Sequence, residues 1–455
     1  MNPMKTFCFV ACLLAGVCAF VPHQRQSSHH SNSLSDSLKP TEWLSTSELE
    51  SIPSVDQISL KELENMSSFE GATLINKLYH LSRINNEMKP EYKPSATDVP
   101  VYIMKPNGHN MSTTLDKLVE AAKNEPDFGD EEVTIFITGM PPKCRTITKT
   151  TDKLVRAYHK RYNGKWNDES SEESQQSKSS GSSSSSEESN EDDKSGRRKE
   201  SKELESTNKR GDLVVIDLGA ALKNFERMFM LDVDNTGSMV GKVIAQLSKE
   251  ADVPQEMIHI VAQGIAAHVA GVAGRQFTRL TGHKLRRITA LDPSKIFVEN
   301  PNTLTALSRG DADFVDAIHT STYGLGSPAR VGDVDFYPNG PSVAVPGSDN
   351  IIEATMKATR YYAESVVPGK ERNFPADDAI SMTDYKNRSG NSKRAYMGID
   401  TDFNLEGDFM LQVNPHSPYG KTSKQFKVNN VRPNNQHNSW KSSGKVSSSR
   451  IPEQP

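Results

Sequence analysis

The stretch from Ile258 to Gln276 reads IHIVAQGIAAHVAGVAGRQ and holds the most informative pattern in the sequence. It opens with a short β-branched apolar run, which is typical of a buried parallel strand. Small residues follow directly and predict a tightly packed helix. The segment AQGIA (262–266) therefore marks a sharp turn from a buried strand into a helix, with Gly264 at its centre.

Similar apolar runs recur on both sides of this turn. The predicted strands are MIHIVA (257–262), VTIFI (133–137), LVVIDL (213–218), RRITAL (286–291) and DFVDAI (313–318). Helical stretches are expected at 149–162, 237–250, 265–280 and 352–366. Such alternation of strand and helix predicts right-handed βαβ units and an α/β fold with a mostly parallel sheet.

The N-terminus reads MNPMKTFCFVACLLAGVCAF and has the features of a secretory signal peptide at residues 1–19, cleaved after Ala19. Its apolar core of about twelve residues is shorter than the roughly 20 that span a bilayer, so no transmembrane span is predicted. Three of the four cysteines leave with this peptide. The mature chain keeps Cys144, which we interpret as a free thiol.

The mature chain divides into several segments by composition. We expect an N-terminal extension at 20–95 with two helical pieces within 44–85, an α/β domain at 96–413, and a disordered tail at 414–455. A disordered acidic insert at 168–210 interrupts the domain; residues 169–190 hold 12 serines and 5 acidic residues. An acidic residue three positions on makes phosphorylation candidates of four serines, Ser170, Ser184, Ser185 and Ser189, although an unmodified spacer is an equal alternative.

Composition excludes several classes of function. Only 35% of the residues are hydrophobic, which excludes a polytopic membrane protein. Lys+Arg 54 against Asp+Glu 58 gives a formal charge of -4 and no reason to expect a nucleic-acid partner. No Walker, Rossmann, zinc or EF-hand pattern occurs, so no cofactor and no metal are expected. Three N-x-Ser sequons make N-glycosylation candidates of Asn65, Asn110 and Asn387.

In α/β-hydrolases, a strand-to-helix turn like that at 262–266 carries the nucleophile elbow G-x-S-x-G. Alanines replace the outer glycines here, and Gly264 replaces the serine. Together with RRITALDPSK (286–295) and DADFVDAIHT (311–320), the stretch from Ile258 closely resembles the pancreatic-type triacylglycerol lipases. The resemblance implies an α/β-hydrolase domain of lipase type.

Carried over residue by residue, the resemblance places the lipase nucleophile at Gly264, the catalytic acid at Asp292 and the catalytic histidine at about Thr355. No histidine lies between His319 and His416, so the base is missing in any register. The oxyanion-side segment falls on 138–140. The family's calcium positions fall on Thr303, Ala306, Ser308 and Asp311, where Asp311 alone is a carboxylate. With two of the three triad members replaced, we expect no enzyme activity, and we interpret Asp292 as a structural residue that caps a turn before Pro293.

Across nearly the whole mature chain the sequence is more similar to the yolk proteins of flies, the lipase-derived vitellogenins. The shared segments include KPTEWLS (39–45), VGDVDFYPNGP (331–341) and KRAYMGID (393–400). This resemblance implies a yolk storage protein secreted into haemolymph, taken up by an oocyte endocytic receptor and kept in yolk granules as embryonic nutrient. It also implies association with other yolk protein subunits, as a homo-oligomer. Two alternatives remain: a carrier of a lipid or steroid conjugate in the lipase cleft, and a residual esterase.

Two further sets of residues have both a structural and a functional interpretation. His268, at the histidine of the lipase SLGAH text, is expected to be packed or hydrogen-bonded rather than a metal ligand. The basic cluster Lys284, Arg286 and Arg287 is a candidate receptor contact, against the simpler interpretation of a solvated helix-to-strand connection. The segment 333–341 is expected to be a turn around Pro338, Asn339 and Gly340.

Overall fold

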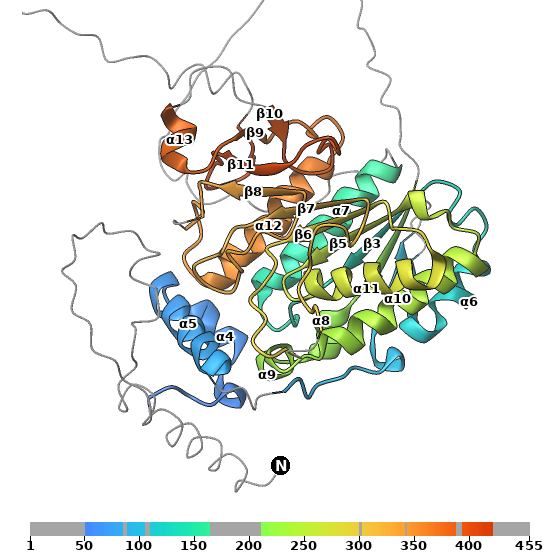
Figure 1. The fold of residues 1–455 in the computed structure, drawn as a ribbon, viewed down its shortest axis with the longest axis horizontal. Coiled ribbons are helices and arrows are strands. Elements are labelled where there is room, and N and C mark those ends of the chain that lie inside the picture. The colour runs from blue at the N-terminus through green and yellow to red at the C-terminus, as the bar shows by residue number, and fades with distance from the viewer. Residues whose placement is uncertain are drawn as a thin grey trace, which may run out of the picture.

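The computed structural model describes residues 51–84, 89–104, 110–163, 211–299, 303–341, 344–387 and 394–421. The predicted signal peptide, the acidic insert with Ser170, Ser184, Ser185 and Ser189, and most of the predicted tail lie outside these residues. Within them, strands and helices alternate around one large sheet (Figure 1).

The sheet has eleven strands in the described residues, in the order β10-β9-β11-β8-β7-β6-β5-β3-β4-β1-β2. A parallel centre contains β4 (Gly211–Ile216), β3 (Glu132–Ile137), β5 (Ile258–Gln263), β6 (Arg287–Leu291), β7 (Phe314–Ile318), β8 (Val334–Pro338) and β11 (Gly407–Leu411). Antiparallel strands complete both sides, namely β1 (Pro100–Met104), β2 (Asn110–Thr114), β9 (Pro375–Asp378) and β10 (Arg394–Tyr396). The mostly parallel sheet confirms the predicted α/β-hydrolase fold.

Helices cover both faces of the sheet because successive side chains of each central strand point to opposite sides. In β5, Ile260 belongs to the hydrophobic cluster that contains residues of α10 (Val233–Glu250) and α11 (Ala266–Thr281). Its neighbour Val261 belongs to a second cluster with residues of α7 (Arg145–Asn163) and α12 (Ile351–Val366). Figure 1 shows α10 and α11 on the side facing the viewer and α7 with α12 behind the strands. Burial on both faces explains the continuous apolar runs of the central strands.

The N-terminal extension contains two helices, α4 (Leu60–Asn65) and α5 (Ser68–Ile84), as the expected helical pieces within 44–85. A capping box begins α4: the amide of Glu62 donates to Ser59 Oγ at 3.1 Å, and the amide of Ser59 donates to the Glu62 carboxylate at 2.9 Å. Ser67 and Glu70 repeat this arrangement at the start of α5. The two boxes end one helix and begin the next within a few residues.

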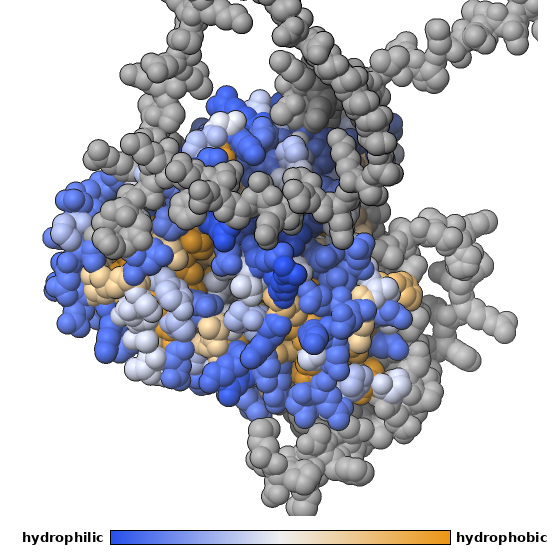
Figure 2. Space-filling view, turned by 180° about the vertical axis from the view of Figure 1, so that it is seen from behind, coloured by the Kyte–Doolittle hydropathy of each residue, from blue (hydrophilic) through white to orange (hydrophobic). Residues whose placement is uncertain are grey.

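Smaller elements complete the domain: η1 (Val55–Gln57), η2 (Ala96–Asp98), η3 (Leu115–Lys117), α6 (Leu118–Lys123), α8 (Leu218–Leu222), α9 (Phe225–Phe229), η4 (Gln255–Met257) and α13 (Met382–Asn387). Large exposed hydrophobic side chains are few among the described residues; they are Phe69, Leu280, Leu304, Ile380 and Phe403. Figure 2 accordingly shows a mainly hydrophilic face with small hydrophobic patches. No helix in this part of the chain has the length and apolar character needed to cross a membrane.

Two boundaries differ from the sequence-based expectation. The predicted tail at 414–455 begins too early, because residues 414–421 pack on the domain: the amides of Tyr419 and Gly420 donate to the Glu364 carboxylate at 2.8 and 3.0 Å. The segment 333–341, expected to be a turn, is mostly β8, and positive φ values at Asn339 and Gly340 confine the turn to its end. Asp335 and Pro338 interrupt the apolar run of this strand, VDFYP, so its five residues gave no clear strand signal.

Candidate functional site

The three positions that matter in an α/β-hydrolase meet at the carboxyl ends of the central strands. Gly264 follows β5, Asp292 follows β6, and Thr355 lies in the second turn of α12. The amide of Gly264 donates to the carbonyl of Leu291 at 3.0 Å, which joins the end of β5 to the end of β6. All three residues are buried, and the exposed fractions of Asp292 and Thr355 are 0% and 1%.

Gly264 adopts the backbone conformation expected of a nucleophile elbow, with φ +59. A Cβ there would meet only Met140 at ordinary van der Waals distance, so space alone does not demand glycine; the left-handed φ does favour it. Gly139, in contrast, is required by space, because a Cβ would collide with the carbonyl oxygen of Gln263. The loop at 138–140 thus lies directly on the elbow, and the side chain of Met140, 2% exposed, covers it.

Asp292 is held entirely by the loop after β7. Its Oδ1 accepts the amides of Thr320 at 2.8 Å and Ser321 at 2.9 Å, and its Oδ2 accepts the hydroxyl of Ser321. Burial raises the pKa of Asp292, while these three donors oppose the shift. The carboxylate therefore organises the turn at 320–321, which corrects the expectation that it caps the turn before Pro293.

Thr355 extends this polar chain. Its hydroxyl lies 2.8 Å from the hydroxyl of Ser321, so Asp292, Ser321 and Thr355 form a continuous buried hydrogen-bonded series. Ser321 was not a predicted site residue: it lies 29 residues from Asp292 in sequence, directly after the DADFVDAIHT segment (311–320), and the resemblance gives it no role. This series holds one carboxyl and two hydroxyl groups and no imidazole, the group that takes the proton of the nucleophile in a Ser-His-Asp triad.

The side chains of His268 and His319 both have hydrogen-bond partners away from Asp292 and Thr355. The ring nitrogens of His319 contact the carbonyl of Ser327 at 3.1 Å and the Asp335 carboxylate at 2.8 Å. His268 Nε2 donates to the carbonyl of Ser294 at 2.7 Å, and its Nδ1 accepts the amide of Leu307 at 3.0 Å. His268 is therefore packed and hydrogen-bonded, as expected, and every ring nitrogen of the two histidines has a partner within the domain.

The helices of the N-terminal extension cover this edge of the sheet. We refer to α4 and α5, residues 60–84, as the N-terminal helix pair. Figure 1 shows it beside α9 and α12, and α4 packs against α12. The pair shares its hydrophobic cluster with Met140, Cys144 and Ile265, which surround the elbow. Gly264, Asp292 and Thr355 are thus buried beneath their neighbours in the part of the chain that the structure describes.

An arginine holds the residues at the family's calcium positions. The guanidinium of Arg275 donates to the Asp311 carboxylate at 2.6 Å and to the carbonyls of Leu304 and Ala306. The amide of Ser308 also donates to Asp311 at 2.9 Å, and the hydroxyl of Thr303 donates to Asp234 at 2.6 Å. No cluster of three or more His, Cys, Asp or Glu with metal-ligand geometry occurs in the described ranges.

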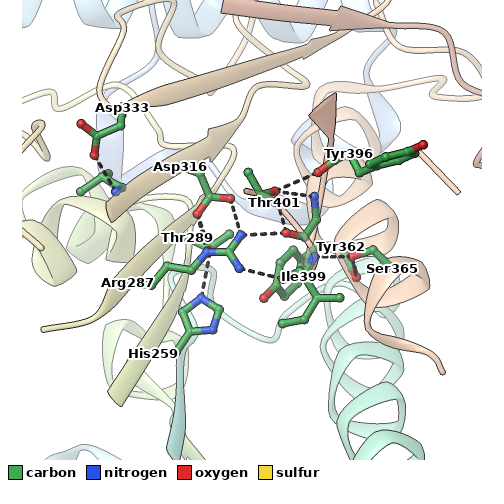
Figure 3. A network of polar contacts seen from close by, with 12 residues as sticks. His259, Arg287, Thr289, Asp316, Asp333, Tyr362, Ser365, Tyr396, Ile399 and Thr401 are labelled. Carbon is green, nitrogen blue, oxygen red and sulfur yellow. Dashed lines mark hydrogen bonds and ion pairs between the residues drawn. The ribbon is translucent and has the colours of Figure 1, made fainter. Parts of the chain in front are cut away.

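The structure separates the members of the predicted basic cluster. Lys284 is exposed and Arg286 is half-exposed, with its guanidinium above the ring of Phe403. Arg287 is only 3% exposed because it forms a bidentate ion pair with Asp316 (Figure 3). Arg287 therefore cannot contact a receptor, and the prediction is wrong for this residue.

The sequon asparagines occupy accessible positions. Asn65 ends α4, Asn110 begins the outermost strand β2, and Asn387 ends α13, and each is exposed. Glycosylation at the three sites stays a prediction.

The fold and these positions define a class: an α/β-hydrolase domain with glycine at the nucleophile elbow and threonine where the resemblance places the base. The model of the family named Lipase matches residues 111–419. The chain is 53% identical to Vitellogenin-1 of Ceratitis capitata, over 97% of this chain and 98% of that protein. It is 48% identical to Vitellogenin-3 of Drosophila melanogaster, over 91% and 96% of the two chains. Lipoprotein lipase of Rattus norvegicus is 42% identical over 23% of this chain and 22% of its own.

The chain therefore belongs to the lipase family and, within it, to the yolk proteins of flies.

Proposed function

We propose that this protein is a secreted, non-enzymatic yolk store, taken up by oocytes and later degraded as an embryonic nutrient reserve. The observation that carries the proposal is its similarity to fly vitellogenins over nearly the full length, at 53% and 48% identity. The predicted signal peptide supports passage through haemolymph. Uptake into yolk granules then requires an endocytic receptor on the oocyte and a stable folded domain, but no active site.

The geometry of the site supports storage over catalysis. An acyl-transfer enzyme needs a nucleophile, a base and an orienting acid that act together. Here the elbow residue is Gly264 and the neighbour of Asp292 is Ser321, whose hydroxyl the carboxylate accepts. Storage is also favoured over carriage of a lipid or steroid conjugate at the elbow, because Met140 is 2% exposed beside it and α4 packs against α12, and Gly264, Asp292 and Thr355 are all buried.

Uptake by oocytes provides the direct test. Purified protein labelled with a fluorophore and injected into the haemolymph of egg-producing females is expected to accumulate in yolk granules, whereas serum albumin with the same label stays outside. Lys284→Glu with Arg286→Glu tests the remaining basic surface, and Lys149→Glu with Lys249→Glu is the control of equal charge change at exposed positions. Exclusion of the wild-type protein from oocytes would contradict the proposal. Equal uptake of the Lys284/Arg286 variant and the Lys149/Lys249 control would show that the basic surface is not the receptor contact.

The absence of catalysis has its own test, hydrolysis of p-nitrophenyl butyrate. The wild-type protein and Gly264→Ser are expected to hydrolyse the ester no faster than buffer, because the new hydroxyl has no base and triad residues act as a unit. Gly264→Ser also places a side chain at φ +59, at a cost of about 1–2 kcal/mol of stability. Gly264→Ser with Thr355→His is expected to exceed the single variant, since Asp292 already lies beside position 355 through Ser321.

Two outcomes would contradict the expected lack of ester hydrolysis. Wild-type turnover that persists after Asp292→Ala would reveal a second site. Turnover by Gly264→Ser alone, at the level of an active lipase, would reveal a base that the described residues do not present.

A further inference from the structure

The eleven-stranded sheet ends in two outer strands that differ in their protection, β10 at one side and β2 at the other. The strand β10 is three residues long, and its first residue, Arg394, forms an ion pair with Asp377 of β9 at 3.1 Å while staying 53% exposed. Short length and an exposed charge are common means by which proteins prevent an outer strand from pairing with a strand of another molecule. The edge at β10 is therefore protected by its own sequence.

The edge at β2 has neither form of protection. Its sequence, NMSTT, contains no charged residue, no proline and no glycine, and it ends in two threonines, which favour strands. The whole strand pairs in regular antiparallel register with β1, from Thr114 opposite Pro100 to Asn110 opposite Met104. Within the described residues β1 is the strand that pairs with β2, so the backbone groups on the outer side of β2 can accept another strand.

The side chains of β2 point to the two faces of the sheet in turn. Met111 packs against the main hydrophobic cluster, whereas Asn110 and Ser112, one position to either side, are exposed on the opposite face. Their partners on β1 are Met104 and Tyr102, which are half-buried against the second cluster. A group attached to Asn110 would therefore stand beside the outer edge, over an accessible face of the sheet.

The sequon Asn110-Met111-Ser112 lies entirely within this unprotected strand. The other sequon asparagines, Asn65 and Asn387, instead end the helices α4 and α13. An N-linked glycan is a bulky, solubilising group. On β2 such a glycan would obstruct the approach of a further strand.

We propose that Asn110 carries an N-glycan and that this glycan protects the outer edge of β2 from pairing with a second copy of the chain. The glycan supplies the protection that Arg394 and short length give to β10. The proposal rests on the secretory route proposed above, because the sequon is an acceptor in secreted proteins. A storage protein is kept concentrated, and concentration favours association between unprotected sheet edges.

Three substitutions of Ser112, which is exposed, separate the glycan from the other properties of the strand. Ser112→Thr keeps the sequon. Ser112→Ala removes it and leaves β2 uncharged, whereas Ser112→Lys removes it and places a charge on the strand. Asn65→Gln, which removes the sequon at the end of α4, is the control for loss of a glycan elsewhere. The full-length proteins are secreted from cultured insect cells, and peptide mapping measures the occupancy of Asn110.

We expect Asn110 to be glycosylated in the wild-type protein and in Ser112→Thr. After concentration and incubation, size-exclusion chromatography should show that Ser112→Ala loses most of its native peak to high-mass species that bind thioflavin T. The native peaks of wild type, Ser112→Thr, Ser112→Lys and Asn65→Gln should persist. The urea midpoints of Ser112→Ala and Ser112→Lys should agree, since an exposed side chain contributes little to stability, so that association is measured separately from unfolding.

A wild-type protein with unmodified Asn110 would overturn the proposal, and this measurement does not depend on the folding of any variant. A native peak of Ser112→Ala as persistent as that of Ser112→Lys would also overturn it, because the uncharged edge would then need no glycan. Loss of the native peak to the same extent in Asn65→Gln would overturn it as well, because the effect would not be specific to β2. None of these results bears on storage, which is contradicted by exclusion of the wild-type protein from oocytes.

Discussion

Replacing Arg287 by leucine is expected to lower the free energy of unfolding by about 3–5 kcal/mol, the usual cost of removing one partner of a buried ion pair. Arg287 Nε and Nη2 donate to the two oxygens of Asp316, both at 2.8 Å, and the carboxylate also accepts the hydroxyl of Thr289 at 2.8 Å. Asp316 is 0% exposed, so the substitution leaves a carboxylate in the core without its cation.

The guanidinium also joins distant parts of the chain. Its remaining N–H groups donate to the carbonyls of Gly398 at 2.7 Å and Ile399 at 3.0 Å, in the segment between β10 and β11 (Figure 3). His259 on β5 contacts Thr289 at 2.9 Å and lies 3.7 Å from Glu132 on β3. Although burial alone would raise it, the pKa of Glu132 is held at about 2 by His259, Arg286 and Arg161. Loss of Arg287 therefore removes contacts to β7 and to the loop after β10, next to a polar network that continues through Thr289 and His259 to Glu132.

Urea unfolding followed by circular dichroism provides the measurement. Arg372→Leu is the matched control: its Nε donates to Asp400 at 2.7 Å, but the side chain is 71% exposed, and such pairs contribute about 1 kcal/mol or less. Arg287→Leu with Asp316→Leu is expected to be more stable than Arg287→Leu alone, because no charge then stays buried without a partner. An equal loss in the free energy of unfolding for Arg287→Leu and Arg372→Leu would show that the buried ion pair stabilises the protein no more than an exposed one.

The central strands could be predicted because their side chains are buried on both faces and form continuous apolar runs, as in IHIVA before Gly264. The outer strands escaped prediction for the opposite reason. The sequence of β2 is NMSTT and that of β9 is PADD, and neither shows an apolar run or a regular alternation. Their pairing is decided by neighbouring strands that lie far away in sequence.

The site was predictable in part for a similar reason. The elbow at Gly264 and the acid at Asp292 follow predicted strands, so local pattern and resemblance both locate them. Ser321 could not be found, because only the fold brings it to Asp292. The burial of Arg287 does have a sequence signal. Asp316 lies inside the apolar run DFVDAI, and a carboxylate within a buried strand requires a cationic partner.

The cover over the site had no sequence signal at all. The pattern of α5 shows that one face of the helix is apolar, but not which surface of the domain receives that face. A helix in an N-terminal extension can pack on its own domain, on another copy or on a partner, and the same amphipathic sequence serves each case.

Acid is expected to destabilise the protein through His268, by about 3 kcal/mol between pH 6.5 and pH 4. The hydrogen bonds of this ring specify the neutral form, because Nε2 donates to the carbonyl of Ser294 while Nδ1 accepts the amide of Leu307. A second ring proton would point at that amide and break the bond. Burial first, and then the charge of Arg275, lower the pKa of His268 to about 4, although the Ser294 bond and Glu299 oppose the shift.

The direction in which stability changes with pH follows from comparing proton binding in the folded and unfolded states. A histidine of pKa about 6.5 in the unfolded chain binds a proton below that pH, whereas the folded ring resists protonation down to pH 4. The contribution of His268 to stability is therefore complete above pH 6.5 and is lost progressively as the pH falls to 4. A shift of about 2.5 pKa units corresponds to about 3 kcal/mol.

His259 has to be separated from His268, because burial lowers its pKa as well. The free energy of unfolding should therefore be measured from pH 7.5 to pH 4.5 for the wild-type protein, for His268→Gln and for His283→Gln, in which an exposed histidine is replaced. His268→Gln is expected to lose some stability at pH 7.5 and to show a clearly shallower fall towards pH 4.5, since glutamine does not titrate. His283→Gln is expected to follow the wild-type curve. Parallel curves for wild type and His268→Gln would mean that the ring is protonated as easily in the folded protein as in the unfolded chain, which the paired donor and acceptor around it do not permit.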